Sequence, residues 1–203
     1  DEGEQGGVVA ATDADAELSA TQSAILAAYA ELIEEVGTDD VSFRVIALRA
    51  GVGERTVFRH YPTRVDLLLA TSAWIERTTF SRSQCESIFD VPIAIREAME
   101  AYDRRPELAY VVAETSMRGV NGAEPAPYRE AFSALLRHEV PSLGENERQQ
   151  IVAALCHLDS AATWVAMRRQ LGMSGRDIAD AATWAAEAIL DPIRDRAEGS
   201  RTL

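Results

Sequence analysis

Five arginines lie close together near the start of the chain, and their side chains are of the kind that binds the phosphates and bases of DNA. They are Arg44, Arg49, Arg55, Arg59 and Arg64. Within residues 41–64 they are opposed only by Glu54, so this segment carries a net charge of +4. The whole chain of 203 residues carries −13, which by itself argues against a nucleic-acid partner. The positive charge that DNA binding requires is therefore concentrated in residues 41–64.

The glycines and apolar residues around these arginines predict a helix-turn-helix. A short helix capped by Ser42 is expected to stop at Gly51, and another is expected from about Glu54 to Tyr61. A tight turn containing glycine lets the second of these helices cross the first at a steep angle. With Val57 and Tyr61 on its inner face, the residues that it would point outward are Arg55, Thr56, Arg59 and His60.

These outward side chains suit contact with DNA. Arginine pairs bidentately with O6 and N7 of guanine, and threonine can contact the methyl group of thymine. Arg44 and Arg64, on either side of the outward set, could bind phosphates. The alternative that the residues leave open is a helical hairpin with a solvated basic face.

The rest of the chain predicts helices throughout and an all-α fold of about nine helices. Ser19 or Thr21 can cap a helix that ends at Val36, and Thr63 with Asp66 has the spacing of a capping box. A long helix is expected over 145–171 and another over 174–190. We expect a disordered acidic arm over 1–17, a helix-turn-helix DNA-binding domain over 18–64, a helical ligand-binding and dimerisation domain over 65–195, and a C-terminal tail over 196–203.

Residues 19–70 resemble the DNA-binding domain of the TetR family of bacterial transcriptional regulators. The motifs that carry this resemblance are Ile46-Ala47, Ala50-Gly51-Val52, Thr56-Val57-Phe58-Arg59-His60-Tyr61 and Leu67-Leu68. The resemblance implies that Thr56 contacts a base, with Arg55 at a variable specificity position. It also implies DNA contacts from Arg44, His60 and Arg64, whereas Phe58 replaces a tyrosine that often donates its hydroxyl to phosphate. The full set expected to bind DNA is Ser42, Arg44, Arg55, Thr56, Phe58, Arg59, His60 and Arg64.

Apolar residues in the last helices step by three and four, as in helices that pack into bundles. The resemblance implies that these helices pair with those of a second copy in a dimer. The expected interface residues are Leu155, Leu158, Ala162, Ile178, Ala182, Ala185 and Ile189. The alternative is that each stripe is core within one chain.

The resemblance also implies a ligand cavity among the central helices. The residues expected to line it are Met99, Tyr102, Tyr110, Met117, Phe132, Trp164 and Met167. Methionine and aromatic side chains suit an adaptable pocket for an apolar small-molecule effector. Ordinary core packing is the alternative for each of them.

Other functions find no support in the sequence. None of His60, His138 and His157 has a second ligand at metal-site spacing, and no catalytic or phosphate-binding motif occurs, so we expect neither an enzyme nor a cofactor. No apolar run is long enough to cross a membrane and no secretory signal is present, which predicts a cytoplasmic protein without a membrane partner. Cys85 and Cys156 lie far apart and indicate no disulfide framework.

The sequence therefore predicts a ligand-responsive, homodimeric transcriptional regulator. We expect a repressor that binds a palindromic operator in double-stranded DNA and is released by a small-molecule effector. The alternative is a helical ligand-binding or protein-interaction dimer whose helix-turn-helix no longer engages DNA.

Overall fold

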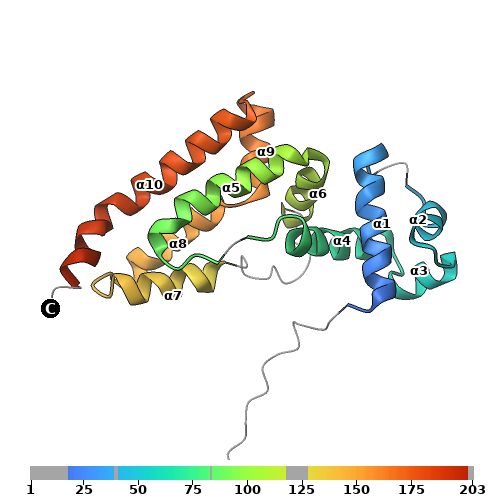
Figure 1. Ribbon diagram of the computed structural model, residues 1–203, viewed down its shortest axis with the longest axis horizontal. Helices are drawn as coiled ribbons and strands as arrows, with labels where there is room; N and C mark the ends of the chain where they lie inside the picture. Colours follow the sequence, from blue (N-terminus) through green and yellow to red (C-terminus); the bar gives the residue numbers. More distant parts are fainter. Residues whose placement is uncertain (1–17, 39–40, 83, 118–127, 201–203) are drawn as a thin grey trace, which may run out of the picture.

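The computed structural model describes residues 18–38, 41–82, 84–117 and 128–200, and the side chains of 117 and 198–200 are not among them. Within these ranges the regular structure consists of ten α-helices and one 3-10 turn, which confirms the all-α prediction. Helices α1–α3 form one end of an elongated molecule, α5 and α7–α10 form the other, and α4 runs between them (Figure 1). The predicted acidic arm lies outside the described residues.

Local signals in the sequence set the ends of the first four helices. They are α1 (Ala20–Val36), α2 (Phe43–Ala50), α3 (Glu54–His60) and α4 (Arg64–Thr78). The Ser19 hydroxyl accepts the N–H of Gln22, and the Gln22 side chain accepts the N–H of Ser19, so a capping box opens α1. Thr63 and Asp66 form the predicted capping box before α4.

The second part of the chain forms a 3-10 turn and six helices. They are η1 (Ile88–Asp90), α5 (Val91–Arg104), α6 (Pro106–Met117), α7 (Arg129–Glu139), α8 (Glu145–Leu158), α9 (Ala161–Gln170) and α10 (Gly175–Ser200). Pro92 and Pro106 occupy first turns, as predicted. Helix α10 does not end at Leu190 as expected, because Ile193 and Ala197 extend its buried stripe.

The prediction of one long helix over 145–171 is wrong. The chain turns at Asp159 and Ser160, which separate α8 from α9. Ser160 caps α9 by accepting the N–H of Thr163 at 3.2 Å, and its hydroxyl donates to the carbonyl of His157 at 2.7 Å. The Asp159 carbonyl is meanwhile engaged by Arg82, 77 residues away, at 2.6 Å. A distant contact therefore accompanies the break, and the described ranges hold ten helices where the sequence predicted about nine.

Helix α10 lies antiparallel along α5 (Figure 1). Near the start of α10, Gly175 is packed against Asp103 of α5 so closely that a Cβ at this position would overlap the carboxylate. Further along, Arg96 of α5 pairs with Asp180 of α10 at 2.7 Å. The missing side chain at Gly175 thus allows the close approach of the two helices.

Candidate nucleic-acid interface

The turn between α2 and α3 depends on a glycine in the left-handed region. Gly51 has φ 68° and ψ 28°, which a residue with a Cβ adopts only with strain. Its N–H donates to the carbonyls of Ala47 and Leu48, and the N–H of Val52 donates to that of Ala47 at 3.0 Å. The turn therefore closes the end of α2, and α3 begins after three residues, as a helix-turn-helix requires.

Helix α3 is anchored by one face and presents the other. Val57 is fully buried, and Tyr61, directly after the helix, is 5% exposed, as the sequence predicted. Arg55 and Arg59 are exposed. Thr56 and His60, which were expected to point fully outward, are instead half-buried at the edges of the presented face.

Three of the five basic side chains in this segment have no counter-charge in the structure. Arg44, Arg55 and Arg59 are exposed and make no ion pair with any residue in the described ranges. Two of them lie on α3 and one in the first turn of α2. A guanidinium without an internal partner keeps its donors available for phosphate or guanine.

The other two arginines are bound within the protein. Arg49 donates to both oxygens of Glu35, at 2.8 and 2.7 Å, and to Glu31 at 3.3 Å. Arg64 donates to the carbonyl of Val41 at 2.6 Å and to that of Thr38, between α1 and α2. Their charge therefore helps to hold α2 and its preceding loop in place.

An aromatic pair joins α2 to α3 on the presented side. The rings of Phe43 and Phe58 lie 4.5 Å apart between centroids and are tilted by 55°. Phe58 nevertheless remains 47% exposed. The sequence singled out Phe58 and not Phe43, because only the fold shows that the first residue of α2 supports it.

Ser42, also expected to bind DNA, is exposed and caps α2. Its hydroxyl accepts the N–H of Val45 at 3.3 Å. The serine caps the first turn of α2, on which Arg44 lies. Its hydroxyl is bonded to the backbone of α2, so its contribution to this surface is to hold that turn in place.

The residues expected to line a ligand cavity lie mostly in the core. Met99 and Trp164 are fully buried, Tyr102 and Phe132 nearly so, and Tyr110 and Met167 half-buried. The Met117 side chain lies outside the described residues. Two hollows of about 310 and 270 Å³ lie elsewhere, between α5 and α10 and between α7 and α8, with mostly charged and polar linings.

The residues expected at a dimer interface divide into two groups. Leu155, Ile178 and Ala182 are fully buried within the chain, as the alternative of an internal core anticipates. The half-buried ones are Leu158, Ala162, Ala185 and Ile189. Trp184 of α10, which the sequence leaves open between interface and pocket, is 70% exposed.

Comparison with known proteins agrees with this geometry. Residues 25–71 match the family model described as bacterial regulatory proteins, tetR family. A TetR transcriptional regulator from Rhodococcus sp. RHA1 superposes with a TM-score of 0.60 at 21% identity, over 86% of this chain and 98% of that one. A TetR variant from Acinetobacter baumannii AYE, in complex with minocycline, gives 0.59 at 19% identity, over 85% and 96%. No curated protein sequence matches the chain.

These findings define a transcriptional-regulator fold of the TetR type. The N-terminal part matches the family model of the tetR bacterial regulatory proteins, and the chain shares the fold of these TetR structures. The family resemblance drawn from the sequence is therefore confirmed.

Proposed function

We propose that the chain is a homodimeric repressor that binds a palindromic operator and leaves it when a small molecule binds among the central helices. The observation that carries DNA binding is the set of three exposed arginines, Arg44, Arg55 and Arg59, that lack an internal counter-charge in the described structure. Two of them lie on α3 and one on α2, and a helix-turn-helix places its second helix in the major groove of DNA.

Selection from a pool of randomised DNA duplexes tests this function. The protein is incubated with the pool at two salt concentrations, and the retained duplexes are sequenced. We expect a palindrome whose affinity falls steeply as salt rises, because the arginines displace counterions from the phosphates. Circular dichroism and light scattering on the same sample establish that the protein is folded and dimeric.

A folded dimer that enriches no sequence at either salt concentration would contradict the proposal. That result would favour the alternative of a helical ligand-binding or protein-interaction dimer. Two observations make this alternative worth testing: two of the five arginines are already bound to the protein's own groups, and Phe58 lacks a hydroxyl for phosphate.

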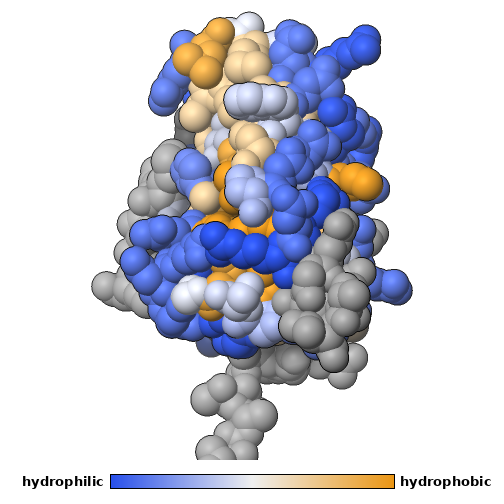
Figure 2. All heavy atoms as spheres, turned by 90° about the vertical axis from the view of Figure 1, so that its left-hand side faces the viewer, coloured by the Kyte–Doolittle hydropathy of each residue, from blue (hydrophilic) through white to orange (hydrophobic). Residues whose placement is uncertain are grey.

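The dimer is proposed to form through α8 and α10. An ion pair between Glu147 and Arg196 at 3.0 Å joins these two helices. The half-buried apolar residues of these helices include Leu158 of α8 and Ile189 of α10, and Trp184 of α10 is exposed. Figure 2, which views this end of the molecule, shows apolar patches interrupting the charged surface. Two copies related by a twofold axis would cover one another's patches.

Replacing Trp184 with aspartate tests this surface. We expect Trp184→Asp to be monomeric by light scattering at concentrations where the parent is dimeric, since a large aromatic side chain at an interface commonly contributes much of the binding energy. Leu48→Asp is the matched control, because Leu48 is 82% exposed on α2, at the opposite end of the molecule from this surface (Figure 1). A dimeric Trp184→Asp protein would exclude this surface as the interface.

The effector is proposed to bind beside Trp164. This side chain is fully buried, its ring centroid lies 5.4 Å from that of Tyr110, and its Nε1 has no hydrogen-bond partner among the described residues. An apolar molecule with one hydrogen-bond acceptor would satisfy that donor. The similar Acinetobacter structure is a complex with minocycline, which supports a small-molecule ligand for this fold. An effector that weakens operator binding must in turn bind more weakly to the operator complex.

A further inference from the structure

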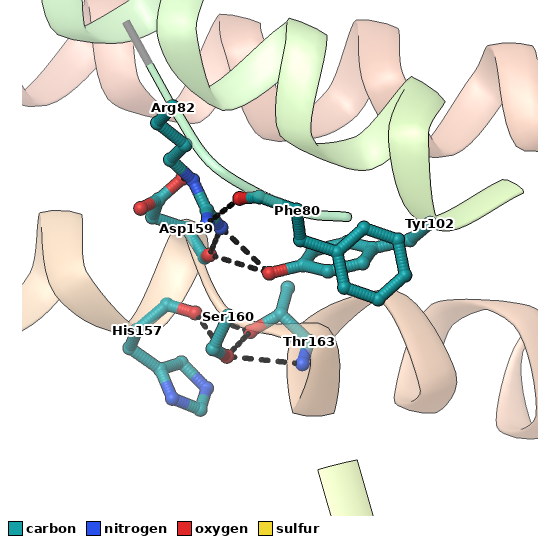
Figure 3. Close-up of polar contacts among 7 residues, drawn as sticks. All are labelled: Phe80, Arg82, Tyr102, His157, Asp159, Ser160 and Thr163. Carbon is teal, nitrogen blue, oxygen red and sulfur yellow. Dashed lines mark hydrogen bonds and ion pairs between the residues drawn. The ribbon is translucent and has the colours of Figure 1, made fainter. Parts of the chain in front are cut away.

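A buried polar cluster lies beyond the end of α4 (Figure 3). Arg82 Nε donates to the Asp159 carboxylate at 2.9 Å, and a terminal nitrogen of the same guanidinium donates to the Asp159 carbonyl at 2.6 Å. That nitrogen also donates to the Tyr102 hydroxyl at 2.6 Å. The Arg82 and Asp159 side chains are only 11% and 4% exposed. One guanidinium therefore engages both the side chain and the backbone of Asp159.

The cluster connects parts of the chain that are far apart in sequence. Arg82 follows α4 by four residues, whereas Asp159 lies at the break between α8 and α9. Tyr102 belongs to α5, and the ring of Tyr128, just before α7, lies 5.0 Å from the guanidinium. The chain that leaves α4 is thus fixed to three neighbouring elements at one point.

Helix α4 is held in two further places. At its start, the capping box of Thr63 and Asp66 follows α3 after a turn of three residues. In its middle, the hydroxyls of Ser72 and Thr115 share a buried hydrogen bond of 2.6 Å, which ties α4 to α6. The direction of α4 therefore depends on these polar contacts together with the packing of its buried residues Leu67 and Ile75.

A buried ion pair adds little stability over apolar packing, because desolvating two charges offsets most of their attraction. Its distinct contribution is geometric: a guanidinium that meets two oxygens of one residue defines a direction as well as a distance. Such a pair is suited to a junction where orientation matters more than stability.

We propose that Arg82 and Asp159 are positioning residues for operator binding. Their contact fixes the direction of α4 relative to α8 and α10, and thereby sets the separation of the two α3 helices in the dimer. The inference rests on the proposed function and adds to it the residues that transmit the dimer geometry to the DNA-binding ends.

The first test measures that separation without DNA. A spin label is attached at Val36→Cys, a 56%-exposed position at the end of α1, after replacement of Cys85 and Cys156 with serine. Distances between the labels of the two protomers are then measured by double electron–electron resonance. We expect a narrow distribution in the parent and a broader or shifted one in Arg82→Gln and in Asp159→Asn.

Arg96→Gln is the matched control, because it removes an ion pair between α5 and α10 that does not touch the chain after α4. If the pair acts as a unit, the double variant Arg82→Gln, Asp159→Asn should show the same change as either single variant. Circular dichroism below the unfolding transition restricts the comparison to folded protein.

Each outcome is informative. An unchanged distribution in a folded dimer would overturn this inference and leave the proposed function standing. A protein with no distance between protomers would be a monomer, which would overturn the dimeric function and this inference together. A change in Arg96→Gln equal to that in Arg82→Gln would show a general loosening of the fold, and would also overturn the inference.

A second readout uses the operator recovered by selection, with one base pair inserted at its centre. The parent should bind this spaced duplex at least tenfold more weakly than the original, whereas Arg82→Gln should discriminate less than threefold. A purely stabilising role would weaken both duplexes alike and leave their ratio unchanged, which would contradict the proposal.

Discussion

Arginines at the two ends of the molecule are used in opposite ways. In the helix-turn-helix, Arg55 and Arg59 are exposed and have no acidic partner in the part of the chain that the structure describes. At the other end, Arg82 and Arg96 each pair with an acid on a different element. Since the chain contains no lysine and each of these groups is an arginine, residue type does not distinguish the two uses. The difference lies in whether the fold supplies the anion or leaves it to a partner.

Two arginines of the helix-turn-helix, like Arg82 and Arg96, have their partners within the protein. Arg49 is bound by Glu31 and Glu35 of α1, and Arg64 by backbone carbonyls before α2. A count of charges over residues 41–64 therefore overstates what can reach DNA. The arginines of a basic segment must therefore be separated into those paired within the protein and those left without a partner, before the segment's charge is assigned to a ligand.

The largest expected effect is on the buried pair. Asp159→Ala leaves the Arg82 guanidinium buried without its carboxylate, and should lower the free energy of unfolding by about 3–5 kcal/mol in urea denaturation. Asp180→Ala, which breaks the exposed pair with Arg96, should cost no more than about 1 kcal/mol. Equal losses in the two variants would remove the distinction between buried and exposed pairs.

The unpaired group should govern sequence preference. Arg55→Ala combined with Thr56→Ala should reduce discrimination between the selected operator and an unrelated duplex by roughly 10- to 100-fold, because one good base contact is worth about 1–3 kcal/mol. Competition binding measures the ratio, and thermal unfolding checks the fold. Retained selectivity would place the base-reading surface elsewhere.

Burial raises the pKa of Asp159 to about 6, although Arg82 opposes the shift. Tyr102, Cys85 and Cys156 are the other titratable groups that interact with it, and their own pKa values are raised, to about 12 for Tyr102 and about 11 for Cys156. Because the folded pKa lies above the unfolded one, the folded state binds the extra proton between pH 4 and 6. This group should therefore make the protein about 1 kcal/mol more stable at pH 5 than at pH 7.

Comparing urea denaturation of the parent and Asp159→Asn at both pH values isolates this contribution. Asparagine does not titrate, so the difference between the two proteins should change with pH in the stated direction. A difference that is constant from pH 7 to 5 would show that Asp159 keeps an ordinary pKa.

The smallest expected effect separates two arginines of the same segment. Arg59→Gln should weaken binding to every duplex by a few-fold and reduce the slope of log affinity against log salt by about 0.9, the value for one phosphate contact. Arg49→Gln should leave that slope unchanged, because its guanidinium is already held by Glu35. Equal slopes for the two variants would contradict the division into paired and unpaired arginines.

The sequence predicts the helix-turn-helix in detail because its signals are local. Ser19 with Gln22 and Thr63 with Asp66 need only a spacing of three to form capping boxes, and Gly51 ends α2 by its own backbone freedom. Such signals survive in any fold that contains the segment. The same reasoning finds the arginines but not their partners, because the carboxylates that neutralise Arg49 lie 14 and 18 residues away.

The helical remainder is less predictable because its determining contacts are distant. The apolar periodicity of residues 145–171 suits one helix. The structure shows instead that the helix breaks at Asp159, where Arg82 binds the chain from 77 residues away. Ile178 and Ala182 follow the spacing expected of a dimer seam, yet they are buried within the chain. Periodicity shows that a face is apolar, but it does not show which surface covers that face.

The tight packing of Gly175 against Asp103 has a mechanical consequence for the whole of α10. A helix of 26 residues is about 39 Å long, so a tilt of about 5° around its first residue would carry its far end through about 3 Å. A methyl group at position 175 would overlap the Asp103 carboxylate, so either that carboxylate rotates away or the two helices separate at the pivot, and any separation would grow along the helix toward Ile193. Gly175 thus lies at one end of α10, the longest helix among the described residues, where a small tilt produces the largest displacement at the other end.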